Sequence, residues 1–217
     1  KNVCLSHNRG VSEPDPSSFI DPHAEKQMPT ESEVVSAVGA VVVLYQPDWA
    51  ISKRLLEVLL VQIQQVCVVD NSPHPDPVLI ANIQSMGVHY QALGGNRGIA
   101  HAQNVGVDYL LGKNVQAVLL LDQDSLIPDD YLTRMWQEHE ILRRRGLHLA
   151  AIGPSYLDRK SNRRSRAIRY RWWGGVQRQT YSPEDGPIAV DYVIASGSLI
   201  DAQAWRDVGG MQEPTWS

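Results

Sequence analysis

Short apolar runs alternate with stretches of helical spacing between residues 34 and 154. The runs are rich in β-branched residues, which favours buried strands, and the stretches repeat apolar residues at intervals of three and four, which favours amphipathic helices. The runs predict strands over residues 38–45, 66–69, 88–91, 115–121 and 150–152. The stretches predict helices over residues 51–64, 78–86, 99–110 and 129–145. This alternation is typical of an α/β fold, with a mostly parallel central sheet flanked by helices.

The two ends of the chain follow a different pattern. Residues 1–33 are polar, contain scattered prolines and show no period of 2 or 3.6, so we expect a disordered leader. After residue 154 the alternation stops, and a basic stretch over residues 158–178 surrounds the pair Trp172-Trp173. A strand is expected over residues 188–194. We therefore divide the folded part, residues 34–217, into a first half over 34–154 and a second part over 155–217.

Composition limits the classes of protein that fit this chain. The 217 residues are 43% hydrophobic and 20% charged, which is ordinary for a globular protein. The net charge of −4 does not favour a polyanion as partner of the whole molecule, and no RNA- or DNA-binding module is recognisable, so we expect no nucleic-acid partner. Cys4 and Cys67 lie far apart and suggest neither a disulfide framework nor a zinc site. With no secretory signal or membrane-spanning run visible, we expect a cytoplasmic protein.

Two carboxylates follow the buried run Val118–Leu121. In an extended chain, alternate side chains point to the same side, so Asp122 and Asp124 would point together and Gln123 away. Convergent carboxylates at the carboxyl end of a buried strand form a hard-oxygen site for Mg²⁺ or Mn²⁺, which would hold a diphosphate. The alternative is a plain turn in which Asp and Ser cap the next helix.

Other polar residues follow neighbouring strands, and right-handed crossovers would bring several of them to one edge of the sheet. Asp70 could accept a hydrogen bond from a pyrimidine ring N–H, or it could close a turn on its own backbone. The loop Gly94–Gly98 opens a helix and would suit an anion, or it is a simple helix cap. Ser196 and Gly197 could line an acceptor pocket or close a hairpin.

The basic stretch over residues 158–178 is also open to two interpretations. Its arginines could grip a diphosphate or an anionic membrane surface, with the paired tryptophans at the interface. The alternative is a solvated loop or hairpin, which is the common outcome for a run of charges.

Five motifs in a set order resemble family 2 glycosyltransferases of the GT-A fold. They are Val-Val-Leu-Tyr-Gln-Pro, Val-Val-Asp-Asn-Ser, Gly-Gly-Asn-Arg-Gly-Ile-Ala-His-Ala-Gln-Asn, Leu-Leu-Leu-Asp-Gln-Asp-Ser and Val-Ile-Ala-Ser-Gly-Ser-Leu-Ile. The resemblance covers about residues 37–212, and within the family it is to bacterial rhamnosyltransferases that build O-antigen and other cell-surface polysaccharides. It implies inverting transfer of a sugar, L-rhamnose from dTDP-L-rhamnose, to a lipid-linked saccharide, with peripheral contact at the inner face of the plasma membrane.

The resemblance also implies roles for residues on the donor side. Tyr45 stands where the family contacts the nucleoside, and Asp70 matches the carboxylate that reads the pyrimidine. Asn96 and Arg97 match the loop near the nucleotide. These residues are therefore expected to belong to a nucleotide-sugar site.

The same resemblance implies a metal pair and an acceptor loop. Asp122 and Asp124 match the family's Asp-x-Asp pair, which binds Mg²⁺ or Mn²⁺; Asp124 is the expected direct ligand, and Asp122 also contacts the nucleotide-sugar. Ser196 and Gly197 match the acceptor-side loop.

The sequence departs from the family near its end. After Met211 the family continues into an acidic segment that carries the general base, whereas this chain reads Gln-Glu-Pro-Thr-Trp-Ser, with Glu213 matching the glutamate just upstream of that segment. We therefore expect a C-terminally incomplete domain in which no catalytic residue is identified. The competing hypothesis is a catalytically inactive nucleotide-sugar-binding remnant. A nucleotidyltransferase is a third hypothesis, but no basic glycine-rich triphosphate loop is visible.

Overall fold

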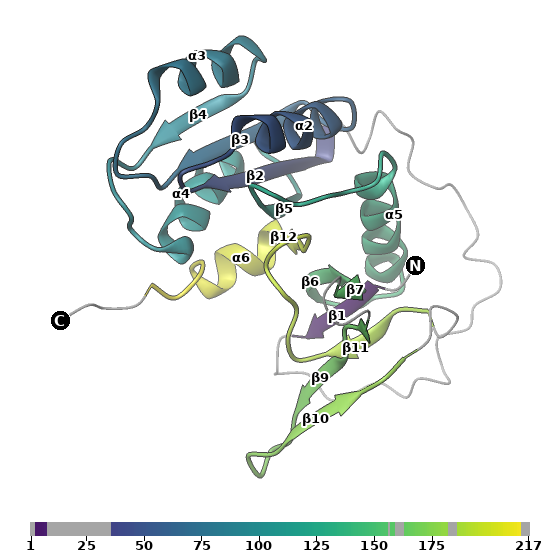
Figure 1. Cartoon of the computed structure of the whole chain (residues 1–217). Helices are drawn as coiled ribbons and strands as arrows, with labels where there is room; N and C mark the ends of the chain where they lie inside the picture. The colour runs from purple at the N-terminus through teal and green to yellow at the C-terminus, as the bar shows by residue number, and fades with distance from the viewer. Residues whose placement is uncertain (1–2, 8–35, 156, 159–162, 182–185, 214–217) are drawn as a thin grey trace.

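An eight-stranded mixed sheet organises the computed structural model, which describes residues 3–7, 36–155, 157–158, 163–181 and 186–213. The strand order is β11-β1-β6-β12-β5-β2-β3-β4 (Figure 1). These strands are β1 (Val3–His7), β2 (Val38–Leu44), β3 (Gln65–Asp70), β4 (His89–Ala92), β5 (Ala117–Asp122), β6 (Leu149–Pro154), β11 (Ile188–Val190) and β12 (Leu199–Asp201). The helices are α2 (Trp49–Leu60), α3 (Pro77–Ser85), α4 (Ile99–Leu111), α5 (Tyr131–Arg144) and α6 (Ala202–Val208).

The parallel half of the sheet is the part that the apolar runs predicted. β2 pairs in parallel with β3 and β5, and β3 pairs in parallel with β4. β2 is buried along its whole length, with Val42 in the core on one face of the sheet and Val41 in the core on the other. The first core contains residues of α2, α3 and α5, and the second contains residues of α4 and α6. Helices therefore cover both faces, which confirms the predicted α/β architecture.

The helices begin where local chemistry favours a start. Asp48 precedes α2 and accepts a hydrogen bond from the Ala50 amide at 2.9 Å, and Asp76 does the same for Val78 at the start of α3. Pro77 occupies the first position of α3, where its missing N–H costs nothing. Capping of this kind satisfies amides that have no partner within the helix.

The other half of the sheet is antiparallel around β6 and β12. β12 pairs with both β5 and β6, β6 pairs with β1, and β1 pairs in parallel with β11. Val3–His7 therefore belongs to the sheet, and the expectation of a disordered leader is wrong for these residues; residues 8–33 lie outside the described part. A five-residue strand whose partners are more than a hundred residues away leaves no local period to detect.

The second part of the chain adds two small two-stranded sheets. One pairs β7 (Leu157–Asp158) with β8 (Arg163–Arg164), and the other pairs β9 (Ala167–Tyr170) with β10 (Val176–Gln179). The strand expected over residues 188–194 is shorter and stops at Val190, because the Asp191 amide turns to donate to the Ile168 carbonyl of β9 at 2.9 Å. Among the described residues, no helix is long and apolar enough to cross a membrane.

Candidate functional site

The carboxyl ends of β2, β3, β4 and β5 meet at one edge of the sheet. Leu44 pairs with Asp70, Asp70 pairs with Ala92, and Val43 pairs with Asp122, so the four strands end nearly in line. The loops that follow are in contact, since the Tyr45 amide donates to Gln123 Oε1 at 2.7 Å. This confirms the expectation that Asp70, the glycine loop and the Asp-x-Asp motif share an edge.

Asp70 is completely buried and both of its carboxylate oxygens are engaged. Oδ1 accepts from the Ser72 amide at 2.8 Å, which is the turn that sequence analysis kept as an alternative, and Oδ2 accepts from the Tyr90 hydroxyl at 2.7 Å. Burial, together with the hydrogen bond to Asp70 and its negative charge, raises the pKa of Tyr90. Tyr90 therefore stays a donor to the carboxylate, and the carboxylate is held in one orientation.

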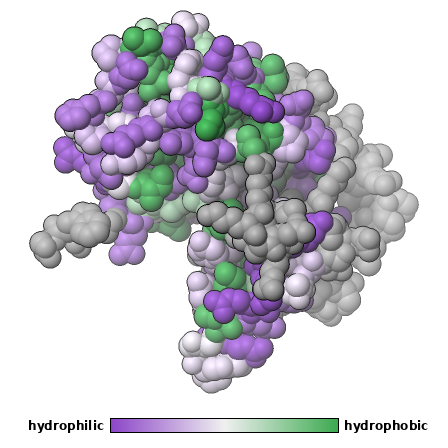
Figure 2. All heavy atoms as spheres, in the orientation of Figure 1, coloured by the Kyte–Doolittle hydropathy of each residue, from purple (hydrophilic) through white to green (hydrophobic). Residues whose placement is uncertain are grey.

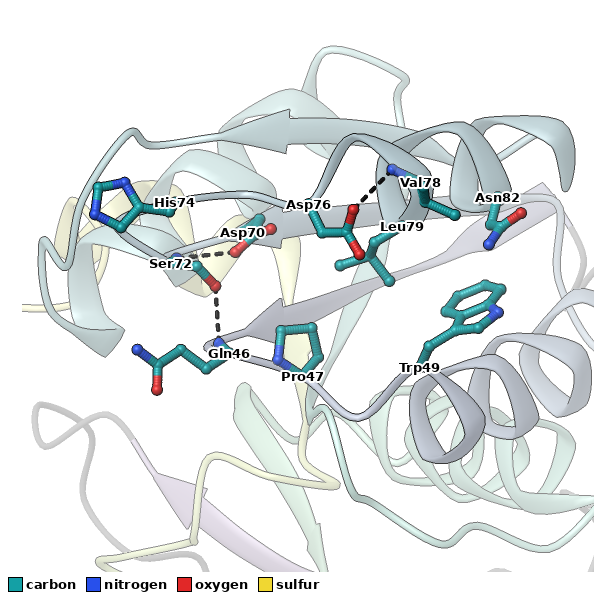
Figure 3. Close-up of a pocket in the computed structure, with 10 residues that line it drawn as sticks. All are labelled: Gln46, Pro47, Trp49, Asp70, Ser72, His74, Asp76, Val78, Leu79 and Asn82. Atoms are coloured by element: carbon teal, nitrogen blue, oxygen red, sulfur yellow. Dashed lines mark hydrogen bonds between the residues drawn. The ribbon is translucent and has the colours of Figure 1, made fainter.

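A cavity of about 370 Å³ opens beside Asp70 (Figure 3). The β2–α2 and β3–α3 connections and the start of α3 form its walls. Its lining residues are Gln46, Pro47, Trp49, Asp70, Ser72, His74, Asp76, Val78, Leu79 and Asn82. The Gln46 amide donates to Ser72 Oγ at 2.8 Å and so joins the two connections. An indole, an imidazole and carboxylates around one space suit a polar heterocycle.

Among the residues that line this cavity, only Asp70 had a role predicted from the sequence, although Gln46, Pro47 and Ser72 lie in the quoted motifs. Trp49, His74 and Asp76 belong to no recognisable motif. The only sign of a site role in the sequence was their position shortly after the strands β2 and β3. Tyr45, which we expected at the nucleoside, is 43% exposed at the same edge and is not among the lining residues.

The glycine loop is tied to the end of β3 through Asn71. Asn71 Oδ1 accepts from the Arg97 amide at 2.7 Å, and Asn71 Nδ2 donates to Asn96 Oδ1 at 3.1 Å. Asn96 Oδ1 also accepts from the Gly98 amide at 3.0 Å, just before α4 begins. Gly98 itself has φ of +86°, a conformation that favours glycine. Asn71 thus positions the glycine loop. In the sequence, only its place next to Asp70 indicated that Asn71 belongs to the site. The Arg97 side chain is exposed.

The Asp-x-Asp segment turns instead of staying extended. The Ser125 amide donates to the Asp122 carbonyl at 3.1 Å, and the Asp122 amide donates to Ser125 Oγ at 3.1 Å. The extended backbone from which we inferred a common direction for Asp122 and Asp124 ends at Asp122, so that inference is wrong in its geometry. Both carboxylates are nevertheless exposed at the sheet edge. Within the described ranges, no group of three His, Cys, Asp or Glu side chains could hold a metal.

Ser196 and Gly197 lie against this turn although they are more than seventy residues away in sequence. Ser196 Oγ lies 3.0 Å from Ser125 Oγ and 3.3 Å from the Asp122 amide. The Gly197 amide donates to the Leu120 carbonyl at 2.7 Å, and the Gly197 carbonyl accepts from the Tyr131 hydroxyl at 2.6 Å. The segment is thus a turn that leads into β12 and lies beside the Asp-x-Asp turn. A role in an acceptor pocket stays a prediction.

Comparison with known proteins decides the family. The model of glycosyl transferase family 2 matches residues 40–200. The chain belongs to this family.

Individual relatives of this family 2 domain are distant. A dTDP-rhamnosyl transferase, RfbF of Shigella flexneri, is 28% identical over 183 residues, which is 82% of this chain and 58% of that protein. The structure of S. aureus TarS 1-349 matches 82% of this chain and 52% of its own, with a TM-score of 0.50 and 13% identity. The mannosyltransferase PcManGT from Pyrobaculum calidifontis, in complex with GDP-Man and Mn²⁺, matches 46% of this chain and 31% of its own, with a TM-score of 0.39 and 18% identity. The TarS likeness supports the GT-A fold, and the chain spans just over half the length of RfbF and of TarS 1-349.

A further cluster on the family 2 domain joins α4 to the segment after α6. Asn104 Oδ1 accepts from the Met211 amide at 2.8 Å, and its Nδ2 donates to the Met211 carbonyl at 3.0 Å. Glu213 accepts from Asn104 Nδ2 at 2.8 Å and lies 3.1 Å from His101 Nδ1, and these two hydrogen bonds lower the pKa of Glu213. Asn104 was quoted in the glycine-loop motif without a role; here it fixes the path of residues 211–213.

Proposed function

We propose that this domain binds a pyrimidine nucleotide-sugar at the carboxyl edge of β2–β5 and transfers the sugar with inversion to an acceptor hydroxyl. We further propose L-rhamnose from dTDP-L-rhamnose as donor and a lipid-linked saccharide of surface polysaccharide (O-antigen) synthesis as acceptor, at the cytoplasmic face of the membrane. The observation that carries the proposal is the buried carboxylate of Asp70 in the wall of the cavity between β2 and β3. The identity to a dTDP-rhamnosyl transferase supports the choice of sugar.

The cavity supports the binding of a nucleobase. Asp70 is held by Ser72 and Tyr90, and each carboxylate oxygen has a further lone pair for a base N–H. Trp49, the first residue of α2, offers an aromatic surface in the wall of the same cavity. Tyr45 then lies beside the nucleoside. The loop around Asn96 and Arg97, at the start of α4, faces the same edge, where helix amides without partners favour a phosphate.

The Asp-x-Asp turn suits a divalent cation that is shared with the substrate. Mg²⁺ and Mn²⁺ prefer oxygen ligands, and Mg²⁺ is commonly bound through one or two carboxylates completed by phosphate oxygens and water. Asp122 and Asp124 supply two exposed carboxylates, and the described part of the chain adds no third His, Cys, Asp or Glu side chain to them, which fits that arrangement. When bound, the cation would offset negative charge on the departing diphosphate. Asp124 would be the direct ligand, and Ser196 and Gly197 would border the acceptor.

Transfer also needs a group that takes the proton of the acceptor hydroxyl. We assign no residue to this role, because Glu213 is engaged by Asn104 and His101 beside α4. A domain that binds the nucleotide-sugar without transferring it is the second candidate. Donor binding and transfer therefore have to be measured separately.

Calorimetric titration with dTDP, UDP and GDP, with and without Mn²⁺, tests the donor site. We expect dTDP to bind in a metal-dependent way, and we expect Asp124→Ala to lose the metal dependence. The matched control is Asp129→Ala, which removes another exposed carboxylate of the same loop. Folded protein that binds no nucleotide, or that binds dTDP equally well after Asp124→Ala, would contradict the proposal. Release of dTDP from dTDP-rhamnose in the presence of a lipid-linked acceptor separates transferase from binding protein.

A further inference from the structure

The β9–β10 hairpin projects from the body of the molecule (Figure 1). Its tip is the turn Arg171–Gly175, which is closed by two hydrogen bonds, from the Arg171 amide to the Gly175 carbonyl at 2.7 Å and from the Gly174 amide to the Arg171 carbonyl at 2.9 Å. All four residues of β10 are exposed. An isolated two-stranded hairpin is only marginally stable in water. An exposed hairpin like this one is therefore a candidate for contact with a partner outside the fold.

The tip carries large apolar side chains that are exposed to solvent. Trp172 is 88% exposed and Trp173 is 60% exposed, and their rings meet edge to face with centroids 5.5 Å apart. Tyr170 and Val176, at the ends of the two strands, are each about half exposed. Figure 2 shows apolar and polar residues side by side on this projection. Single exposed apolar residues are common, but a cluster at the end of a projection marks an interaction surface.

The part of the chain that contains the hairpin, residues 163–181, is strongly cationic. Residues 163–181 contain six arginines and no aspartate or glutamate, in a chain whose net charge is −4. The arginines are Arg163, Arg164, Arg166, Arg169, Arg171 and Arg178. Arg171 lies over the Trp173 ring, 5.0 Å from its centroid, and donates to Gln177 at 3.0 Å. Arg169, Arg171 and Arg178 belong to the hairpin itself, so the charge complement of the hairpin is an anionic surface.

The base of the hairpin is fixed to the main body. The Tyr170 amide donates to Asp191 Oδ2 at 2.6 Å, and the Asp191 amide donates back to the Ile168 carbonyl at 2.9 Å. Ala167 and Tyr181 pack with Val190 of β11 in a small apolar core of their own. The ribbon is thus anchored at its base and presents its tip away from the α3 end of the sheet, where the nucleotide cavity lies.

We propose that this tip, Tyr170–Val176 with the surrounding arginines, docks on an anionic phospholipid bilayer. Trp172 and Trp173 enter the boundary between head groups and acyl chains, where indole rings with one apolar face and one polar N–H are favoured. Arg171 and Arg178 contact the lipid phosphates, and such contacts strengthen attraction to anionic lipid. A neutral saccharide offers these cations no negative charge to contact. A single-stranded nucleic acid is typically held in a basic groove lined by aromatic rings, whereas this cluster stands at a projecting tip.

Vesicle sedimentation with the full chain tests the proposal, and it needs no nucleotide, metal or acceptor. The vesicles are phosphatidylcholine with or without phosphatidylglycerol. We expect binding to the anionic vesicles that weakens with salt, and about fivefold weaker binding for each of Arg171→Gln and Arg178→Gln. The control pair Arg54→Gln and Arg145→Gln makes the same change of charge at exposed positions of α2 and after α5, and should bind like the wild type. Trp172→Ser with Trp173→Ser should abolish the blue shift of tryptophan emission on vesicle addition.

Three outcomes would overturn the docking surface. The first is an equal loss of vesicle binding in the hairpin pair and the control pair. The second is binding to neutral vesicles as strong as to anionic ones. The third is a set of hairpin variants that keep vesicle binding but no longer bind a soluble saccharide or single-stranded nucleic acid. Each variant is compared with the wild type by thermal unfolding and by dTDP titration. A failed donor site would appear in the titration and leave the vesicle result unaffected, so the two proposals fail independently.

Discussion

Gly106 lies in α4 where the helix crosses β2 and β3, and its replacement by alanine puts two physical effects in opposition. A Cβ atom at this position would lie 2.6 Å from Val41 Cγ1, 2.9 Å from Val41 Cγ2 and 3.1 Å from Val69 Cγ2. Both valines are completely buried in strands within the sheet. Because a valine side chain is stiff at χ1, neither neighbour can rotate away cheaply.

The magnitudes decide the direction of the change. Alanine is better than glycine inside a helix by about 1 kcal/mol, whereas overpacking a buried contact costs about 1–3 kcal/mol. We therefore expect Gly106→Ala to lower the free energy of unfolding by about 1 kcal/mol, the difference between these central values. With a urea slope of about 2 kcal/mol per molar, the midpoint of unfolding falls by about 0.5 M.

Urea unfolding followed by circular dichroism measures this change. Asp108 is exposed on the same helix, so the difference between Asp108→Ala and Asp108→Gly reports the helix-propensity effect without the clash. Combining Gly106→Ala with Val41→Ala should cost less than the sum of the two single changes, because Val41→Ala removes the clash and the added methyl group fills part of the cavity that it leaves. A Gly106→Ala variant more stable than the wild type would refute the steric reasoning. A displaced α4 also moves the glycine loop, so dTDP affinity should fall in parallel.

Three further predictions concern a hydrogen bond to Asp70, the carboxylate of Asp201 and the thiol of Cys67. Tyr90→Phe leaves Oδ2 of the buried Asp70 without its donor, so we expect a loss of about 1–3 kcal/mol in urea unfolding and weaker dTDP binding; unchanged values for both would contradict the role given to this pair. Burial raises the pKa of Asp201, but hydrogen bonds from His139 and from backbone amides at the start of α6 outweigh it and hold the pKa below its ordinary value. As pH falls, the unfolded state takes up the proton first, so this stabilisation is present above the ordinary aspartate pKa and is lost on acidification through the lower folded-state pKa. Asp201→Asn keeps an oxygen that can cap α6 but removes the charge. Its melting temperature should therefore depend less on pH between about 6 and 3 than that of the wild type. Burial raises the pKa of Cys67 to about 12, so iodoacetamide should label this thiol only after unfolding, and rapid labelling of native protein would be inconsistent with its burial.

Local sequence determined the parallel half of the fold and the edge at which its loops meet. The buried run Val38–Leu44 and the run before Asp122 are strands in the structure within one or two residues of their predicted bounds, because continuous apolar stretches need burial on both faces of a sheet. Asp70 and the glycine loop were placed correctly because chain direction is shared by parallel strands. These features depend on residue spacing alone, which a sequence shows directly.

Only the tertiary structure decided which distant segments complete the site. Val3–His7 joins the sheet through β6 and β11, Ser196 reaches Ser125, and Asn104 holds Met211 across 107 residues. Each of these contacts depends on hydrogen-bond partners brought together by the packed sheet, so no local period or motif reveals them. The turn at Asp122 is local and was the alternative that the sequence offered, but its contact with the distant Ser196 comes from the packed sheet.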